Sequence, residues 1–303
     1  MKKLLVAVIA VAIGVLYFEN PWQVKEGDVL HEQFFKKFDR EEIARIEMEQ
    51  LMSAVQLKRT EAGWEVNELR SAFKQELDKK ESNESPKDGP RWYPVEEERI
   101  DMSLSALEDL TITSLAGKNP NRHSFFEVDD TTGLHVRGFN KKGETVFHCI
   151  IGKTGPDYMN NYVRKEKENE VYLSRSYLKS SFPLDVDGWR RRTLWTIPPD
   201  SIEKIVIKRQ NGEETLTKEN KEWVNLLNQV ANLKAQSFVD DPNEQTGLQN
   251  SSLTISIISN VGASTLHLGK KTASNAYYGQ KEGDPQVYIL RASLTEAIEK
   301  TLK

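Results

Sequence analysis

Acidic residues occur as two adjacent pairs at similar points of the sequence. Asp129-Asp130 precedes a Thr-Gly-Leu tripeptide at 132–134, and Asp240-Asp241 precedes a second one at 246–248. Paired carboxylates can act as acid and base in hydrolysis, and carboxylate oxygens are common ligands of calcium. Adjacent aspartates in loops also form Asx turns and remain hydrated. A hydrolytic function therefore requires these carboxylates to converge in one cleft.

A Gly-Lys-Thr sequence at 152–154 invites comparison with phosphate-binding loops, which end in this way. Such a loop also needs a glycine five residues before Gly152, where this chain has Phe147, and the residues between them have the pattern of an apolar strand. A second Gly-Lys pair stands at 269–270. We therefore expect each glycine to end a strand in a turn, and we expect no nucleotide site.

Histidine and cysteine do not group into a metal site. His148 and Cys149 are adjacent, so their side chains point to opposite faces of a strand and cannot bind one ion together. His135 and His267 fall on predicted strands without clustered ligands, and no spacing matches a zinc site. The single cysteine excludes intramolecular disulfides and multi-cysteine metal sites. We expect neither a metal nor another cofactor.

The segment at 189–195, Trp-Arg-Arg-Arg-Thr-Leu-Trp, combines three cations with two indoles. Arginine stacks on tryptophan and binds carboxylate or phosphate through two hydrogen bonds. One interpretation is docking onto a partner or onto acidic headgroups. The other is a strut between two modules, whose arginines pair with acids of the same chain, and the acid-rich composition favours it. The candidate partner-binding residues are Trp189, Arg190, Arg191, Arg192 and Trp195.

The elements that carry these motifs recur along the chain. Five landmarks keep one order in both halves: an isoleucine-rich segment at 43–48 or 202–207, a tryptophan at 64 or 223, Thr-Gly-Leu at 132 or 246, Gly-Lys at 152 or 269, and Val-Tyr at 171 or 287. A repeat of this kind predicts two copies of one module. The first copy is longer and contains a charged insertion at about 74–90, which we expect to be a solvated or disordered loop.

Periodicity predicts the elements of each copy. Short alternating segments such as 253–257 predict antiparallel strands, and Asn211-Gly212 predicts a hairpin turn. Helical spacing predicts one helix over 100–110 and another over 224–234. Ser293, with Glu296 three residues later, predicts a capping box at the start of a final helix.

The fold class that follows is α+β, with two tandem copies of an antiparallel sheet carrying helices. The first module is expected over residues 31–188 and the second over 189–303, with the junction near 182–199. The length of 303 residues suits two domains of about 150 residues each.

The first residues predict export to the cell envelope. An unbroken apolar or small-residue run at 4–18 follows Lys2 and Lys3, and these lysines predict a cytoplasmic N-terminus with the bulk of the chain outside, on the periplasmic or cell-surface side. Fifteen helical residues span about 22 Å, which is short for a bilayer and fits a cleaved signal peptide. No small-residue cleavage site follows, and Tyr17, Phe18 and Trp22 suit the membrane interface, so we favour a signal anchor over 1–22.

Charge excludes one class of partner. The chain has 42 lysines and arginines against 46 aspartates and glutamates, which gives a net charge of −4. A general nucleic-acid-binding protein would be basic. We therefore expect no nucleic-acid partner.

The second half of the chain resembles the bacterial domain-of-unknown-function 4340 (DUF4340) family. The resemblance rests on Arg-Arg-Thr-Leu at 191–194, the segment 199–205, Trp223, the helix predicted after it, Thr-Gly-Leu at 246, Leu-Gly-Lys at 268 and Val-Tyr-Ile at 287. It covers the second module almost end to end and the first more loosely. The resemblance implies a membrane-anchored envelope protein, often encoded beside gliding-motility-type ABC transporter components, and it carries no established catalytic residues.

The function expected from these patterns is that of a non-enzymatic envelope accessory protein. It would be held in the membrane by residues 4–18 and would bind or scaffold an ABC transporter permease or another envelope protein. Two alternatives stay open. One is an envelope hydrolase that acts on glycan or peptide through the acidic loop residues, and the other is a small-ligand binding module.

Overall fold

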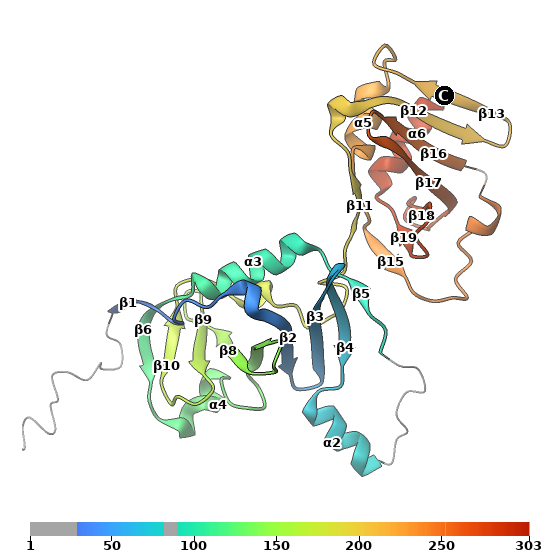
Figure 1. Cartoon of the computed structure of the whole chain (residues 1–303). Coiled ribbons are helices and arrows are strands. Elements are labelled where there is room, and N and C mark those ends of the chain that lie inside the picture. The colour runs from blue at the N-terminus through green and yellow to red at the C-terminus, as the bar shows by residue number, and fades with distance from the viewer. Residues whose placement is uncertain (1–28, 82–89, 252, 303) are drawn as a thin grey trace, which may run out of the picture. The chain divides into compact units, whose positions relative to one another are not determined.

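The chain folds as two compact units. Residues 29–81, 90–251 and 253–302 are described by a computed structural model. Unit 1 ends at Trp189 and unit 2 begins at Arg190. Figure 1 shows the strands and helices of each unit. The expected anchor segment 4–18 lies outside the described residues, as do residues 82–89 of the expected insertion. Within the described part, no helix has both the length and the apolarity needed to cross a membrane.

Unit 1 is built on one ten-stranded sheet whose neighbouring strands pair antiparallel. The strand order is β1-β6-β10-β9-β8-β7-β2-β3-β4-β5. The strands are β1 Val29–Gln33, β2 Ile43–Gln50, β3 Ser53–Thr60, β4 Gly63–Leu69, β5 Tyr93–Pro94, β6 Thr111–Gly117, β7 Leu134–Asn140, β8 Thr145–Thr154, β9 Asn161–Lys165 and β10 Val171–Ser174. Short helices connect them: η1 Arg40–Glu42, α2 Ala72–Glu81, α3 Glu97–Glu108, η2 Pro120–Arg122, α4 His123–Phe126 and η3 Lys179–Ser181.

Helix α3 packs on one face of this sheet and forms the main core of unit 1 (Figure 1). Its buried apolar residues Ile100, Leu104 and Leu107 have the spacing that predicted the helix, which ends at Glu108. They pack with alternate residues of the strands, such as Met48 and Val136. Part of the opposite face is covered by α4, where Phe126 and Val128 join a second small cluster.

Helix α2 corrects the expectation of a loop at 74–90. Residues 74–81 are helical, and Ser71 Oγ accepts a hydrogen bond of 3.1 Å from the Lys74 amide, as an N-cap does. Lysine, glutamate, glutamine and alanine have high helix propensity, so charge and low apolarity do not by themselves disfavour a helix.

Unit 2 contains a seven-stranded antiparallel sheet and a separate two-stranded one. The larger sheet has the order β13-β12-β16-β17-β18-β19-β15, and β11 pairs with β14. The elements are β11 Thr193–Thr196, η4 Pro199–Ser201, β12 Ile202–Arg209, β13 Gly212–Leu216, α5 Trp223–Val230, β14 Asn232–Lys234, β15 Ser237–Val239, η5 Leu248–Asn250, β16 Leu253–Ser259, β17 Gly262–Lys271, β18 Tyr277–Lys281, β19 Val287–Ile289 and α6 Ala292–Thr301.

The core of unit 2 confirms the strand pattern and corrects both helices. Burial alternates strictly along β16, and β12 and β13 form the predicted hairpin. Helix α5 ends at Val230, because the chain turns there into β14, so the apolar residue Leu233 belongs to a strand. Trp223 begins this helix whereas Trp64 lies in β4, so the two tryptophan landmarks fall in different kinds of element.

The capping box predicted for α6 is absent. Arg291 is the N-cap and makes no side-chain cap bond. Ser293 lies inside the helix, where its Oγ donates a hydrogen bond of 2.8 Å to Gln229 Oε1 of α5. Helices α5 and α6 are thereby tied together beside their shared apolar residues, which include Leu226 and Ile298.

Candidate functional site

Arg190 of the Trp-Arg-Arg-Arg segment is buried and fully engaged within unit 2. Its Nη1 and Nη2 lie 2.6 and 3.0 Å from the two carboxylate oxygens of Asp240. Nη2 also donates to Gln286 Oε1 at 2.9 Å, and the guanidinium carbon stands 3.7 Å from the centre of the Phe238 ring. A bidentate ion pair stacked on an aromatic ring is a strong and specific use of arginine. Arg190 thus fixes the edge of the sheet beside β15.

The two tryptophans of the segment are buried, each in the core of its own unit. Trp189 donates its Nε1 hydrogen to the Pro183 carbonyl at 2.8 Å in unit 1. Trp195 donates to the Val230 carbonyl at 2.7 Å in unit 2. Buried indoles with satisfied N–H groups are packing residues.

The other two arginines differ in exposure. Arg192 donates from Nη1 to the Gln236 carbonyl and lies 5.5 Å from the Phe238 ring. Arg191 is exposed. Of the five candidate partner-binding residues, Arg191 is therefore the one whose side chain is most accessible to another molecule.

The glycines of the two Gly-Lys pairs have the same structural role. Gly152 is the eighth residue of β8 and Gly269 is the eighth of β17. A Cβ atom on Gly152 would lie 2.2 Å from the Phe126 carbonyl oxygen, and one on Gly269 would lie 2.1 Å from that of Thr246. Each glycine therefore lets another part of the backbone cross its strand closely, and neither ends a strand in a turn as expected. The element after β8 is β9, so the helix of a phosphate loop is missing here.

The acidic pairs hold local structure. Asp129 Oδ1 accepts hydrogen bonds from the amides of Thr131 and Thr132 at 2.9 and 3.0 Å, which is an Asx turn. Burial alone would raise the pKa of Asp129, but these bonds and that of the Thr132 hydroxyl lower it below its usual value. Asp130, which is exposed, lies 3.3 Å from Arg164 Nη2.

The second acidic pair lies in unit 2. Asp240 binds Arg190, and Asp241 Oδ1 accepts a hydrogen bond of 2.9 Å from the Asn243 amide. The pairs thus belong to different units. In the described part of the chain, no group of three or more His, Cys, Asp and Glu side chains could hold a metal ion.

A buried histidine pair in unit 1 is the main feature that sequence reasoning missed. His135 Nδ1 lies 3.0 Å from His148 Nε2, and both side chains are buried. His148 Nδ1 lies 3.3 Å from Glu166 Oε2. In the β7–β8 hairpin, His135 pairs with Ile150 and Arg137 pairs with His148. The two histidines are therefore diagonal neighbours on one face, whereas they had been expected to stand apart.

The carboxylate fixes the tautomers of this relay. A carboxylate only accepts, so neutral His148 donates from Nδ1 to Glu166 and accepts at Nε2. His135 must then donate from Nδ1, which leaves its Nε2 as a buried acceptor without a hydrogen-bond partner in the described structure. Glu166, His148 and His135 thus form one chain of polar contacts, which ends at His135 Nε2 within the described residues.

Burial, assisted by a nearby cation, lowers the pKa of both histidines and favours their neutral forms. Burial and the nearby Arg137 lower the pKa of His148 to about 4, against the opposing effect of Glu166. Burial and Arg137 also lower the pKa of His135, although Asp130 and Glu49 act in the opposite direction. The neutral state of both rings follows from desolvation, which penalises the charged form.

Arg137 and Glu49 join this polar face to helix α2. Arg137 Nη1 lies 3.1 Å from Glu49 Oε2, and Glu49 Oε1 accepts a hydrogen bond of 2.5 Å from the Ala72 amide. Burial alone would raise the pKa of Glu49, but these contacts lower it. A cavity of about 160 Å³ lies beside both residues.

Cys149 faces the opposite side of β8 from His148, as expected for adjacent strand residues. It is buried in the main core, and burial raises the pKa of its thiol. A protonated thiol in an apolar core is a packing residue and a poor nucleophile.

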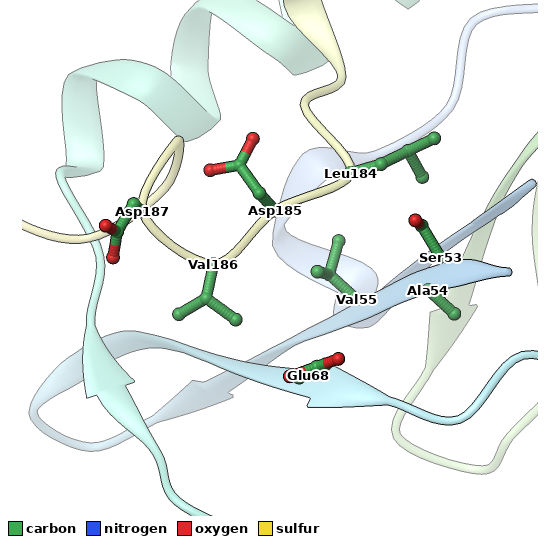
Figure 2. A pocket seen from close by; sticks show the side chains of 8 residues that line it. All are labelled: Ser53, Ala54, Val55, Glu68, Leu184, Asp185, Val186 and Asp187. Carbon is green, nitrogen blue, oxygen red and sulfur yellow. The ribbon is translucent and has the colours of Figure 1, made fainter. Parts of the chain in front are cut away.

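One cavity of unit 1 has an acidic rim. It has a volume of about 340 Å³ and lies where the loop 184–187 runs over β3 and β4, as Figure 2 shows. Val186 points toward the strands, whereas the Asp185 carboxylate points away from them and accepts a hydrogen bond of 2.7 Å from the Gly188 amide. The full lining is Ser53, Ala54, Val55, Glu68, Leu184, Asp185, Val186 and Asp187. Such a site has apolar walls and could receive a cationic group.

Comparison with known proteins gives one family match. No curated protein and no solved structure matches the chain. A family model described as a domain of unknown function, DUF4340, matches residues 88–251, from before α3 in unit 1 to just before β16 in unit 2. The match extends less far into the second unit than the sequence resemblance suggested. Because it spans more than half of the 303 residues, the chain belongs to the DUF4340 family.

Proposed function

We propose that this chain is a non-enzymatic accessory protein of the cell envelope. In this proposal residues 4–18 anchor it in the membrane, and its folded units bind or scaffold an ABC-type transport system or another envelope protein. The link to a transporter rests on the family resemblance, and the anchor rests on the apolar run after Lys2 and Lys3.

One observation carries the non-enzymatic part of the proposal. The groups with the best prospects for chemistry are engaged in holding the fold: Asp129 closes an Asx turn, Asp240 binds Arg190, and Gly152 admits a crossing backbone segment. The hydrolase alternative needs these carboxylates free and gathered together. Their structural engagement favours the binding function.

Arg191 is the position at which we would test partner binding. A photo-crosslinking residue at Arg191 in the full chain, expressed in native membranes, is expected to capture an envelope protein. The matched control is the same residue at Arg209, which is exposed on β12 of the same unit. Capture of no envelope protein from either position, or equal capture from both, would count against a specific partner at this segment.

Fractionation tests the anchor separately. We expect the full chain to stay with membranes after alkaline washing and to retain residue 1 or 2 at its mature N-terminus. A mature chain that begins beyond residue 18 and washes free would show a cleaved signal peptide instead.

We propose also that the units are two copies of one module. The order β3-β2-β7-β8-β9-β10-β6 within unit 1 corresponds strand by strand to β13-β12-β16-β17-β18-β19-β15 in unit 2. The glycines at 152 and 269 fall at the same place in corresponding strands. An experimental structure should superpose β8 and β17 with these glycines aligned, and a different register would contradict a duplication.

Small-ligand binding is a second candidate, favoured by the acid-rimmed cavity of unit 1. Its volume of about 340 Å³ falls within the range of ligand pockets, and its acidic residues select for cations. Calorimetric titration of the full chain with a polyamine tests this candidate. Binding that weakens at least several-fold in Glu68→Gln would support it, and no heat of binding at millimolar polyamine would remove it.

A further inference from the structure

The turn between β8 and β9 presents two large side chains to solvent. Tyr158 is 81% exposed and Met159 is 69% exposed. The backbone of Tyr158 is left-handed, with φ of 61°. A bulky residue in this conformation costs about 1 kcal/mol. An exposed side chain recovers none of that cost by packing within its own unit.

The corresponding turn of unit 2 has an asparagine at its left-handed position. Asn275 has φ of 60°, and its amide donates to the Thr272 carbonyl at 3.1 Å, as the Tyr158 amide donates to that of Gly155. Asparagine tolerates this conformation well because its short side chain can hydrogen-bond locally. Ala276 follows it and is buried. Both turns contain a left-handed residue with the same hydrogen bond, but the turn of unit 1 runs over 155–160 and is one residue longer than that of unit 2 at 272–276, and only the turn of unit 1 carries Tyr-Met.

A second exposed aromatic residue, Phe125, lies among cations, one of which comes from the strand that leads into this turn. Phe125, at 56% exposure, has Lys153 Nζ at 4.0 Å from its ring centre and Arg122 Cζ at 5.3 Å. Lys153 lies near the end of β8 that leads into the turn. Within the described ranges, neither Lys153 nor Arg122 forms an ion pair, although acids outnumber bases in the chain.

Asp157, the acidic residue of this turn, uses its carboxylate for hydrogen bonds within the turn. Asp157 Oδ1 accepts a hydrogen bond of 3.0 Å from the Met159 amide, and its Oδ2 accepts one of 3.0 Å from Asn160 Nδ2. Both carboxylate oxygens thus hold the shape of the turn. They help to keep Tyr158 and Met159 pointing outward.

We propose that Tyr158, Met159 and Phe125, with Arg122 and Lys153, form a surface that contacts an anionic lipid bilayer. We call it the tip surface. Tyrosine and other aromatic residues favour the headgroup region, and lysine and arginine next to them bind anionic headgroups. Exposed side chains on a turn suit insertion into a soft interface, whereas protein-binding hot spots lie in closely packed pockets. The proposal adds a second membrane contact to the proposed anchor and does not depend on any protein partner.

Fluorescence in vesicles tests the tip surface in the full chain. Met159→Cys is labelled with a polarity-sensitive dye, while native Cys149 is buried and stays unlabelled. The matched control is Ser274→Cys in the corresponding turn of unit 2, where Ser274 is also exposed. In vesicles that contain phosphatidylglycerol, we expect brominated acyl chains to quench the dye at 159 several-fold more than the dye at 274. Equal quenching at both positions would overturn the proposal.

A second experiment tests whether the two cations are required for contact with the lipid. Arg122→Gln with Lys153→Gln is expected to reduce quenching at 159 at least several-fold and to remove its dependence on phosphatidylglycerol, with the circular dichroism unchanged. Unchanged quenching would contradict the role of the cations. If the dye at 159 is shielded in native membranes but not in protein-free vesicles, its occupant is a protein and the lipid proposal is wrong. Partner capture at Arg191 is read separately, so either proposal can fail alone.

Discussion

The histidine pair makes the stability of unit 1 depend on pH at the scale of single residues. The pKa of His148 is about 4 in the folded unit and 6.5 in an unfolded chain, so the unfolded state takes up the proton first. We expect full stability above pH 6.5 and a progressive loss, as pH falls from 6.5 to 4, that totals about 3 kcal/mol. The lowered pKa of His135 acts in the same direction. Urea unfolding of the full chain at a series of pH values measures this loss.

A variant separates the histidines from other acid effects. The carboxyl groups with lowered pKa values, such as Glu49 and Asp129, lose their contribution only below about pH 4.5. In His148→Gln the loss between pH 6.5 and 5 should therefore shrink to well under half. The same slope in the variant and the wild type would show that the pair does not titrate as we expect.

Tyr158 and Asn275 allow a reciprocal exchange. Tyr158→Asn should raise the free energy of unfolding by about 0.5–1 kcal/mol, because asparagine tolerates the left-handed backbone better. Asn275→Tyr should lower it by a similar amount for the same reason. Denaturant unfolding measures both. A loss of stability in Tyr158→Asn would mean that the tyrosine is held by packing, and the argument for the tip surface would lose its first step.

The sequence alone predicts some residue contacts and not others, because a contact between two strands depends on their register. That His148 and Cys149 lie on opposite faces followed from adjacency alone. That His148 meets His135 depends on which residues pair across the β7–β8 hairpin, and a shift of one residue would separate them. Counting outward from the turn at 141–143 would place His135 opposite Cys149, and only the register shift between Gly138 and Phe139 moves it opposite Ile150, on the same face as His148.

At the scale of elements, the glycines at 152 and 269 are the positions at which a backbone segment crosses a strand. Gly152→Ala and Gly269→Ala should each lower the free energy of unfolding by about 2–3 kcal/mol, since the added Cβ meets a carbonyl oxygen that belongs to fixed backbone. Denaturant unfolding of each variant measures the loss.

Gly143→Ala is the control for this substitution. Gly143 has nothing within 4 Å of an added Cβ, and its φ of 82° is its one demand for glycine. Its substitution should therefore cost only about 1 kcal/mol. Similar losses in all three variants would show that backbone conformation, rather than close approach, explains the Gly-Lys pairs.

Element boundaries were less predictable than element types. The alternating burial of β16 needed only a two-residue period. The end of α5 could not be located, because Leu233 continues the apolar spacing of a helix while its backbone pairs with Trp195 of β11. A contact between residues far apart in sequence decides that boundary, and local periodicity does not contain it.

At the scale of the whole molecule, each unit has its own apolar core. The main core of unit 1 and that of unit 2 share no residue. Calorimetry of the full chain in detergent should therefore resolve two unfolding transitions. Gly152→Ala should lower one melting temperature by roughly 5–10 °C, and Gly269→Ala should lower the other. A single transition, shifted alike by both variants, would show that the units unfold together.

The buried thiol of Cys149 reports on the opening of unit 1. The thiol is the only one in the chain and lies in the core of one unit, so it reacts with a thiol reagent only when that unit opens. With reclosing faster than reaction, the labelling rate is the reagent's intrinsic rate multiplied by the population of the opened state. The free energy of opening unit 1 can therefore be followed by thiol labelling of the intact chain, separately from the opening of unit 2.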